Sequence, residues 1–240
     1  MTDKKLHAIT PHRSAVKDLL NHETEDRVER IEKEFKAGFE IVNGFVNTVT
    51  VFGSARFLED NEYYKKARET GAALAQEGFT VVTGGGGGIM EAANRGAYEI
   101  GGKSIGFKIQ LPNEQQLNAY TTESMPFRYF FARKVMLAYA ASALICFPGG
   151  FGTFDELFEV ITLVQTGKMP PVPIILVGKE FWNPIDKYIN EMLLDKLGVI
   201  SHGDEELYKI IDDVEEIKQI VIARQEISSV FTLPAKPTDS

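Results

Sequence analysis

The chain has 240 residues, of which 44% are hydrophobic and 25% charged, values typical of a globular protein with a full core. Its formal charge of −8 argues against a nucleic-acid backbone or an anionic membrane as the main partner. The single cysteine, Cys146, allows no intrachain disulfide, and we expect no metal site. Because the sequence has neither a signal peptide nor a run of 18 apolar residues, we expect a soluble, cytoplasmic protein.

The N-terminal part is expected to be helical. Residues 14–43 are rich in Glu, Lys and Arg and carry a broken apolar stripe, which predicts one or two amphipathic helices lying on the core or on a second subunit. We therefore divide the chain into a helical extension (1–45), a nucleotide-binding catalytic domain (46–226) and a tail (227–240), whose end is expected to be disordered.

Residues 48–52 form a β-branched, apolar run that predicts a strand. It ends at Gly53 and Ser54, and a strand leading into such a turn is the usual opening of a nucleotide-binding α/β sheet. The spacing of residues 63–76 predicts a helix that stops at Gly78, and residues 79–83 predict a second strand.

Five consecutive glycines, Gly84 to Gly88, connect this second strand to a helix. Because ordering each glycine costs conformational entropy, we infer that the backbone here passes very close to a ligand or to another chain segment. The run is a weak G-x-G-x-x-G match, and no Lys-Ser or Lys-Thr follows it, so neither a dinucleotide nor an ATP γ-phosphate is well supported. The candidate binding residues are Gly84, Gly85 and Gly86.

Residues 104–107 predict a third strand. Residues 108–126 have no clear periodicity and are predicted to form a long loop, which in a compact domain is more often functional than idle. A helix over 127–141 carries Arg133 and Lys134, either as surface charges or as groups that face an anion, since this helix leads into the next strand.

The central motif follows an apolar run at 143–147 that predicts a buried strand. The turn after it leads directly into a helix, whose N-terminal N–H groups and dipole favour an anion such as phosphate. A hydroxyl and a carboxylate follow within one turn. The alternative is a tight strand–helix turn with a solvent-facing glutamate. The residues of this candidate phosphate cradle are Gly149, Gly150, Gly152, Thr153 and Glu156.

Towards the C-terminus the sequence predicts a strand at 171–178, a helix through 181–194, an edge strand at 207–211 and a helix at 213–224. Strands that alternate with helices indicate an α/β fold, a Rossmann-like doubly wound parallel sheet with helices on both faces. All three glycine turns then lie at the carboxyl edge of the sheet, where such folds bind ligands. The four histidines are scattered and none is assigned a role.

Four segments together resemble the Lonely Guy (LOG) family, whose members were often labelled "possible lysine decarboxylase". They are Thr83 to Gly86, Gly88 to Ala93, Arg133-Lys134, and Pro148 to Glu156. The resemblance covers residues 48–200. It implies hydrolysis of the N-glycosidic bond of nucleoside 5′-monophosphates to a free base and ribose 5-phosphate. The base is a cytokinin in plants and some microbes, and an ordinary purine or pyrimidine in longer bacterial relatives. Glu91, where many short members have glycine, places this chain nearer the longer branch.

The resemblance also implies roles for individual residues. Arg133 and Glu156 match the catalytic pair, and the substrate-binding positions are Gly53, Ser54, Gly84, Gly85, Gly86, Met125, Lys134, Gly149, Gly150, Gly152 and Thr153. It implies a homodimer or higher homo-oligomer, because the family's sites lie at a dimer interface. No cofactor is expected: the old label would require pyridoxal phosphate on a Schiff-base lysine, and no lysine is placed for one.

The chemistry is consistent with these residues. Cleavage of a ribosyl C–N bond develops positive charge on the sugar, which a carboxylate at Glu156 can stabilise while it orients or deprotonates water. Arg133 does not serve as an acid and would instead hold the phosphate or a ribose oxygen. Two alternatives stay open: a non-catalytic protein of the same fold that binds or carries a nucleotide or nucleotide-like cofactor, and a mainly structural or regulatory oligomer.

Overall fold

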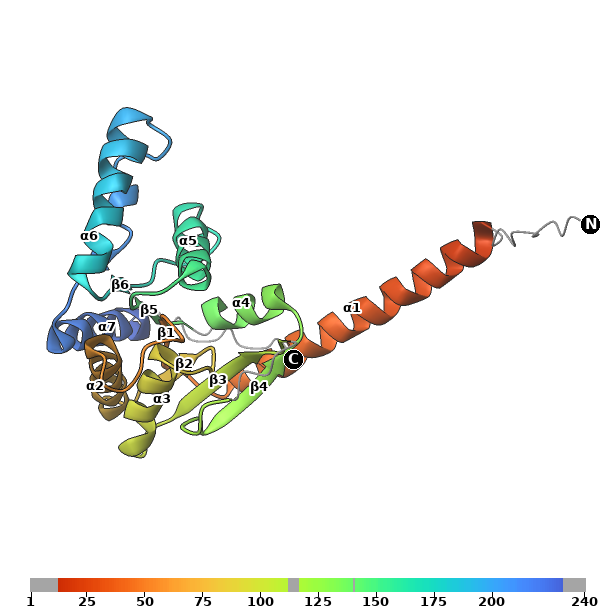
Figure 1. The fold of residues 1–240 in the computed structure, drawn as a ribbon, viewed down its shortest axis with the longest axis horizontal. Coiled ribbons are helices and arrows are strands. Elements are labelled where there is room, and N and C mark those ends of the chain that lie inside the picture. Colours follow the sequence, from red (N-terminus) through yellow and green to blue (C-terminus); the bar gives the residue numbers. More distant parts are fainter. Residues whose placement is uncertain (1–12, 112–116, 140, 231–240) are drawn as a thin grey trace, which may run out of the picture.

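A parallel β-sheet forms the centre of the molecule. The computed structural model describes residues 13–111, 117–139 and 141–230, and of residues 13–22 and 225–230 only the backbone. Within this part of the chain the sheet has seven strands in the order β4-β3-β2-β1-β5-β6-β7 (Figure 1). Every neighbouring pair is parallel. The strands are β1 (Thr48–Phe52), β2 (Thr80–Thr83), β3 (Ser104–Ile109), β4 (Glu123–Phe127), β5 (Ala143–Cys146), β6 (Ile174–Leu176) and β7 (Lys209–Ile210).

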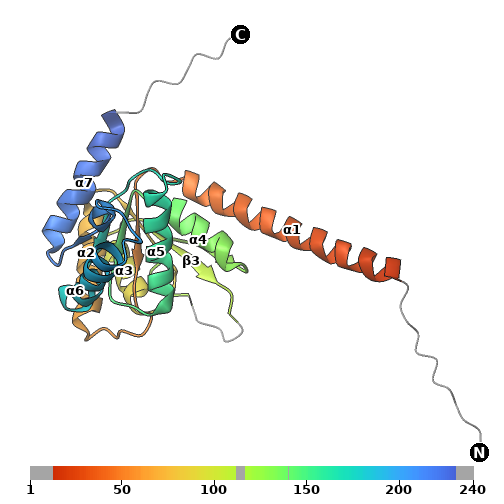
Figure 2. The same cartoon turned by 90° about the horizontal axis from the view of Figure 1, so that it is seen from above.

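Helices cover both faces of this sheet (Figures 1 and 2). They are α1 (Arg13–Asn43), α2 (Glu62–Gln76), α3 (Ile89–Glu99), α4 (Phe130–Tyr139), α5 (Phe151–Gln165), α6 (Lys179–Tyr188) and α7 (Val214–Val230). Helix α6 continues as a π-helical segment, Ile189–Lys196, and a 3-10 turn spans Asp204–Glu206. The predicted doubly wound α/β fold is therefore confirmed.

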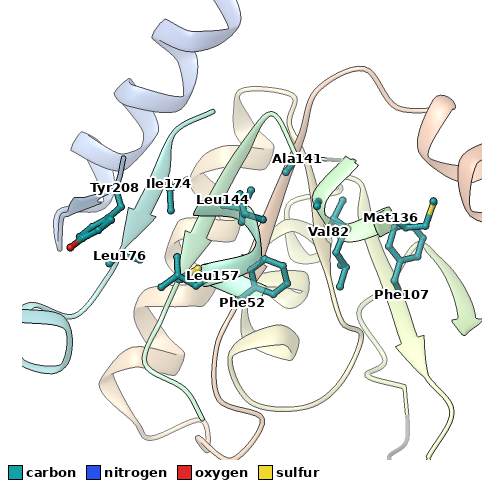
Figure 3. Packing of buried hydrophobic residues seen from close by; sticks show 14 of the residues in the cluster. Phe52, Val82, Phe107, Met136, Ala141, Leu144, Leu157, Ile174, Leu176 and Tyr208 are labelled. Carbon is teal, nitrogen blue, oxygen red and sulfur yellow. The ribbon is translucent and has the colours of Figure 1, made fainter. Parts of the chain in front are cut away.

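Two apolar clusters fill the layers between the sheet and its helices. Helices α2, α3 and α7 enclose one cluster, and α4, α5 and α6 enclose the other, part of which Figure 3 shows. Because side chains alternate along a strand, β1 contributes Val49 and Val51 to the first cluster and Phe52 to the second. Burial on both faces explains the continuous apolar runs that made the inner strands easy to predict. Cys146 is buried in the second cluster, as a small core residue.

The topology fixes where a ligand can bind. Strand β1 lies between β2 and β5. The connections after β1 and β2 cross one face of the sheet, and the connection after β5 crosses the other face. This is the switch point of a doubly wound sheet, and a crevice opens there beyond the carboxyl ends of the strands.

The predicted long loop over residues 108–126 is wrong at both ends. Strand β3 extends to Ile109, and residues 123–127 form β4, which pairs with β3 in register Lys108↔Pro126. No strand signal is present here, because β4 is an edge strand whose first residues are exposed and no apolar alternation marks it. Pro126 is tolerated because an edge strand leaves one side of its ladder unpaired. Residues 112–116 lie outside the described part of the chain, as does the predicted disordered end of the tail.

Helix α1 is one continuous helix, and only its C-terminal portion packs on the domain (Figure 2). The ring of Phe39 lies edge-on to Tyr139 of α4, with centroids 4.9 Å apart. Glu34 accepts hydrogen bonds from the backbone N–H groups of Arg128 (2.8 Å) and Tyr129 (3.3 Å), immediately before α4 begins. The preceding turns project away from the sheet. Of the two predicted placements, the core placement therefore holds for this portion. In the described residues, no helix combines the length and apolar character needed to cross a bilayer.

Candidate active site

A cavity of about 620 Å³ lies at the switch point and brings most of the predicted residues together. The predicted residues that line it are Gly53, Ser54, Gly84, Gly86, Arg133, Gly150, Gly152, Thr153 and Glu156. Arg56, Met90, Lys108 and Ile109 line it as well, although none of them was a predicted site residue. Of the remaining predicted residues, Gly85, Met125, Lys134 and Gly149 are not among those that line the cavity.

The start of α5 forms one wall. Its first intrahelical hydrogen bond runs from the Phe154 N–H to the Gly150 carbonyl (3.2 Å), and none of the described side chains caps the helix. The three preceding N–H groups are therefore available to a ligand. A Cβ added at Gly150 or Gly152 would meet no atom within 4 Å, so both glycines border open space. Such a helix start is a suitable anion site because its N–H groups and dipole act together.

Gly149 has a different function. A Cβ there would overlap Thr153 Oγ1, so this glycine lets the buried threonine pack under the turn. The turn is also tied to β1, since the N–H of Ser54 donates to the Pro148 carbonyl (3.0 Å). The hydrogen bond fixes the position of the turn after β1 relative to the turn after β5.

The glycine run after β2 packs against other parts of the chain. A Cβ at Gly84 would overlap the Nη2 atom of Arg133, and one at Gly88 would overlap the Ser54 carbonyl. Gly85 and Gly88 also have φ values of +69° and +65°, which favour glycine. Of the two explanations left open by the sequence, close approach to another segment holds at these positions.

A buried polar network fixes the shape of this run, and sequence reasoning missed it. Thr83 Oγ1 donates to Asn94 Oδ1 (2.6 Å) and accepts from the Gly85 N–H (2.9 Å). The Asn94 amide donates to Ser104 Oγ (2.7 Å), and the Asn118 amide donates to the Gly86 carbonyl (3.0 Å). The available signal was an asparagine on the inner face of α3, because a buried polar side chain must find partners.

Arg133 and Glu156 face each other across the cavity from α4 and α5. Arg133 Nε donates to the Phe107 carbonyl at 2.8 Å, and its Nη2 lies 3.8 Å from Glu156 Oε1. Their side chains are only 10% and 14% exposed. The predicted pair is therefore adjacent and largely buried, and Arg133 is held in place by β3.

Burial also sets the protonation of the pair. Desolvation raises the pKa of Glu156 to about 7, and the positive charge of Arg133 opposes this rise. Desolvation lowers the pKa of Arg133, and the negative charge of Glu156 partly offsets this decrease. The guanidinium nevertheless stays protonated at neutral pH. A carboxyl group that titrates near neutrality can act as a general acid or base at physiological pH.

Lys134 and Met125 do not line the cavity. Lys134 Nζ forms ion pairs with Asp155 (2.9 Å) and Glu159 (3.1 Å) on α5, which flank Glu156 in the sequence. It therefore ties α4 to α5. Met125 packs against the apolar cluster beneath α4, and Glu91 accepts a hydrogen bond from the Tyr64 hydroxyl of α2 (2.9 Å).

Comparisons with known proteins identify relatives of this chain. A family model described as "Possible lysine decarboxylase" matches residues 90–221, which is just over half of the chain. A cytokinin riboside 5′-monophosphate phosphoribohydrolase of Rhodococcoides fascians is 27% identical over 174 residues, covering 70% of this chain and 85% of that protein. The rice enzyme of the same name, LOG, is 30% identical over 168 residues, covering 68% and 66%.

Solved structures share the fold. The molybdenum cofactor carrier protein of Chlamydomonas reinhardtii superposes with a TM-score of 0.55 at 22% identity, over 76% of this chain and 98% of that one. The molybdenum cofactor binding protein of Rippkaea orientalis superposes with a TM-score of 0.54 at 19% identity, over 78% and 98%. At these identities the likeness extends to the fold alone.

Proposed function

Because the chain belongs to the LOG family, known also by the label "possible lysine decarboxylase", we propose that it hydrolyses the N-glycosidic bond of nucleoside 5′-monophosphates to a free base and ribose 5-phosphate. The observation that carries this proposal is one cavity that holds both an uncapped helix start and a buried Arg–Glu pair. The first suits a phosphate, and the second suits a sugar that becomes cationic as its bond to the base breaks.

Each residue has a defined part in this reaction. The N–H groups at the start of α5 and the Thr153 hydroxyl bind the phosphate, and Gly150 and Gly152 leave room for it. The ionised Glu156 stabilises the developing charge at C1′ and takes a proton from water as the water oxygen attacks C1′. The electron pair of the C1′–N bond leaves with the base, which takes up a proton. Arg133 orients Glu156 and binds a sugar or phosphate oxygen.

Incubation of the purified protein with AMP, followed by chromatography, tests the proposal. We expect free adenine and ribose 5-phosphate in equal amounts. Adenosine should be a far poorer substrate, because binding of the remote phosphate supplies energy for orientation at C1′. Intact AMP after prolonged incubation with excess protein would contradict the proposal.

A carrier of a nucleotide-like cofactor is the second candidate, since two proteins of this fold are named as molybdenum cofactor carrier or binding proteins. The buried Glu156, raised in pKa and facing Arg133, favours the enzyme, because binding of an anionic ligand gains nothing from a carboxylate in the cavity. Tight nucleotide binding without base release would favour the carrier.

A second copy of the chain is the partner that we propose for the outer face of α4 and α5. This face exposes large apolar side chains, and Phe151 at the cavity rim is 95% exposed. A patch of this kind on a water-soluble domain marks an interaction surface. Light scattering should give at least a dimer, and a monomer at micromolar concentration would contradict this proposal. The other exposed large apolar residues of these two helices are Phe130, Phe131, Val135, Tyr139 and Phe158, and of these Phe131 and Tyr139 also contact Phe35 and Phe39 of α1.

The reaction should depend on pH through Glu156. Because burial raises its pKa to about 7 and the carboxylate is the working form, kcat/KM for AMP should fall about 10-fold per unit as the pH drops below 7 and level off above it. The second ionisation of the nucleotide phosphate lies near pH 6, so the dissociation constant must be measured over the same range to separate the two. A kcat/KM that is constant from about pH 5 to pH 8 would rule out this role.

Replacing Lys134 should shift that profile. The charges nearest Glu156 are Arg133, Asp155, Lys134 and Glu159, and Lys134→Met removes the cation that offsets the two flanking carboxylates. The pKa of Glu156 should rise further, moving the acidic limb of kcat/KM upward by up to about one pH unit. The matched control is Lys36→Met, which removes an ion pair with Glu32 on exposed α1 and should leave the profile unchanged.

A further inference from the structure

Lys108 is a half-buried lysine in the cavity that the reaction described above does not use. It lies on the inner strand β3, between Phe107 and Ile109, both of which are buried in an apolar cluster. Among the ion pairs of the described residues, none involves Lys108, whereas Arg133 in the same cavity faces Glu156. Its ammonium group, which only donates hydrogen bonds, is therefore available to a ligand that enters the cavity.

The strand order separates Lys108 from the phosphate end of the cavity. The helix start that suits the phosphate follows β5, and β3 lies three strands away, in the order β3-β2-β1-β5. At a spacing of about 4.8 Å between strands, the two strand ends lie roughly 14 Å apart. This separation is comparable to the length of a nucleotide, so Lys108 lies near the base when the phosphate is at α5.

Arg133 fixes the direction of the nucleotide between these two ends. Its Nε is bound to the carbonyl of Phe107, the residue before Lys108, and its Nη2 faces Glu156 on α5. The guanidinium therefore lies between the two walls, where the sugar must be for Glu156 to reach C1′. A phosphate at the start of α5 and a sugar at Arg133 leave the β3 side to the base.

We propose that Lys108 binds the edge of the base and makes 6-oxopurine nucleotides better substrates than 6-aminopurine nucleotides, an inference that rests on the proposed function. An ammonium group only donates hydrogen bonds. A 6-oxopurine offers it two adjacent acceptors, O6 and N7, whereas adenine places an amino donor beside N7. The N6-substituted adenine of a cytokinin has the same disadvantage.

The test compares inosine 5′-monophosphate with adenosine 5′-monophosphate, which differ at this edge of the purine. For the wild-type protein, kcat/KM should favour the inosine nucleotide by on the order of 10-fold. Lys108→Met should reduce that ratio to about one, and Lys108→Arg, which keeps the donor, should retain a preference. Inhibition by ribose 5-phosphate, which has no base, should be the same in all three proteins.

Arg56→Met is the matched control, because Arg56 is a second cation at the cavity, located after β1 rather than β3. It should weaken both nucleotides alike and leave their ratio unchanged. The inference would be overturned if Lys108→Met had the same ratio of the two kcat/KM values as the wild-type protein. It would also be overturned if the substitution weakened the binding of both nucleotides and of ribose 5-phosphate equally, because this result would place Lys108 at the phosphate.

Calorimetry separates this inference from the proposed function. If neither nucleotide releases its base, the proposed function fails, and the two dissociation constants then replace kcat/KM in the comparison. Tighter binding of the inosine nucleotide that is lost in Lys108→Met would still support the assignment of Lys108. Equal binding of both nucleotides to the wild-type protein would overturn it.

Discussion

Glu156→Gln is expected to lower kcat for AMP by about 1000-fold while the nucleotide dissociation constant changes little. The amide occupies the same volume but neither takes a proton from water nor carries the negative charge that stabilises a cationic sugar. Phosphate binding at the start of α5 does not depend on this carboxylate. Single-turnover base release, with binding measured separately by calorimetry, distinguishes the two effects.

Loss of folding does not explain such a result. Burial raises the pKa of Glu156 to about 7 in the folded protein. The free energy of unfolding therefore decreases as the pH rises from the ordinary pKa of a glutamate through 7, because ionised Glu156 is less stable in the folded protein than in the unfolded chain. The glutamine variant has no buried charge, and its melting temperature above pH 7 should equal or exceed that of the wild type. Glu32→Gln is a suitable control, since Glu32 is an exposed glutamate on α1 that does not line the cavity. Near wild-type turnover in Glu156→Gln would remove this residue from the mechanism.

Gly84→Ala is expected to lower kcat/KM by about 100-fold with little loss of stability. A Cβ at this position would overlap Arg133 Nη2 and lie 2.8 Å from Met90 Sδ. Both atoms are at the ends of long side chains, which can move at small cost to folding. The guanidinium would nevertheless leave its position beside Glu156, and a displacement of this size disrupts the geometry that the reaction needs.

The same glycine run provides the control for this substitution. Gly87 does not have a positive φ, and a Cβ there would meet only the Ala55 carbonyl at 3.6 Å, an ordinary contact. Gly87→Ala should therefore retain activity and melting temperature. Equal loss of activity in both variants would show that the run needs glycine for backbone freedom or ligand access, and not to make room for Arg133.

The inner elements of the fold were predictable because burial on both faces leaves a continuous apolar run. Strand β1 coincides with the predicted residues 48–52, and α2 begins one residue earlier than the predicted 63–76. Strand β4 was not predictable, since an exposed edge strand that contains Pro126 carries no such signal. Its parallel pairing with β3 depends on backbone hydrogen bonds, which leave no trace in side-chain composition.

Within the site, the motifs predicted which residues meet but not what each of them contacts. Three glycine turns and the Arg133–Glu156 pair converge as expected, because parallel strands place their carboxyl ends at one edge. The contacts of Lys134 with Asp155 and Glu159 depend on how α4 lies against α5, which neither helix determines alone. For the same reason Met125, predicted to bind substrate, lies against the core.

Local apolar patterns, glycine turns and the paired motifs were sufficient to predict the α/β class, the order of the inner strands and helices, and most of the residues that line the cavity. The three-dimensional structure was needed to show that Gly84 makes room for Arg133, that Asn94 holds the glycine run, and that Lys108 lines the cavity with no ion-pair partner among the described residues. Each of these depends on distances between segments far apart in the chain, and such distances are set by how the helices pack on the sheet.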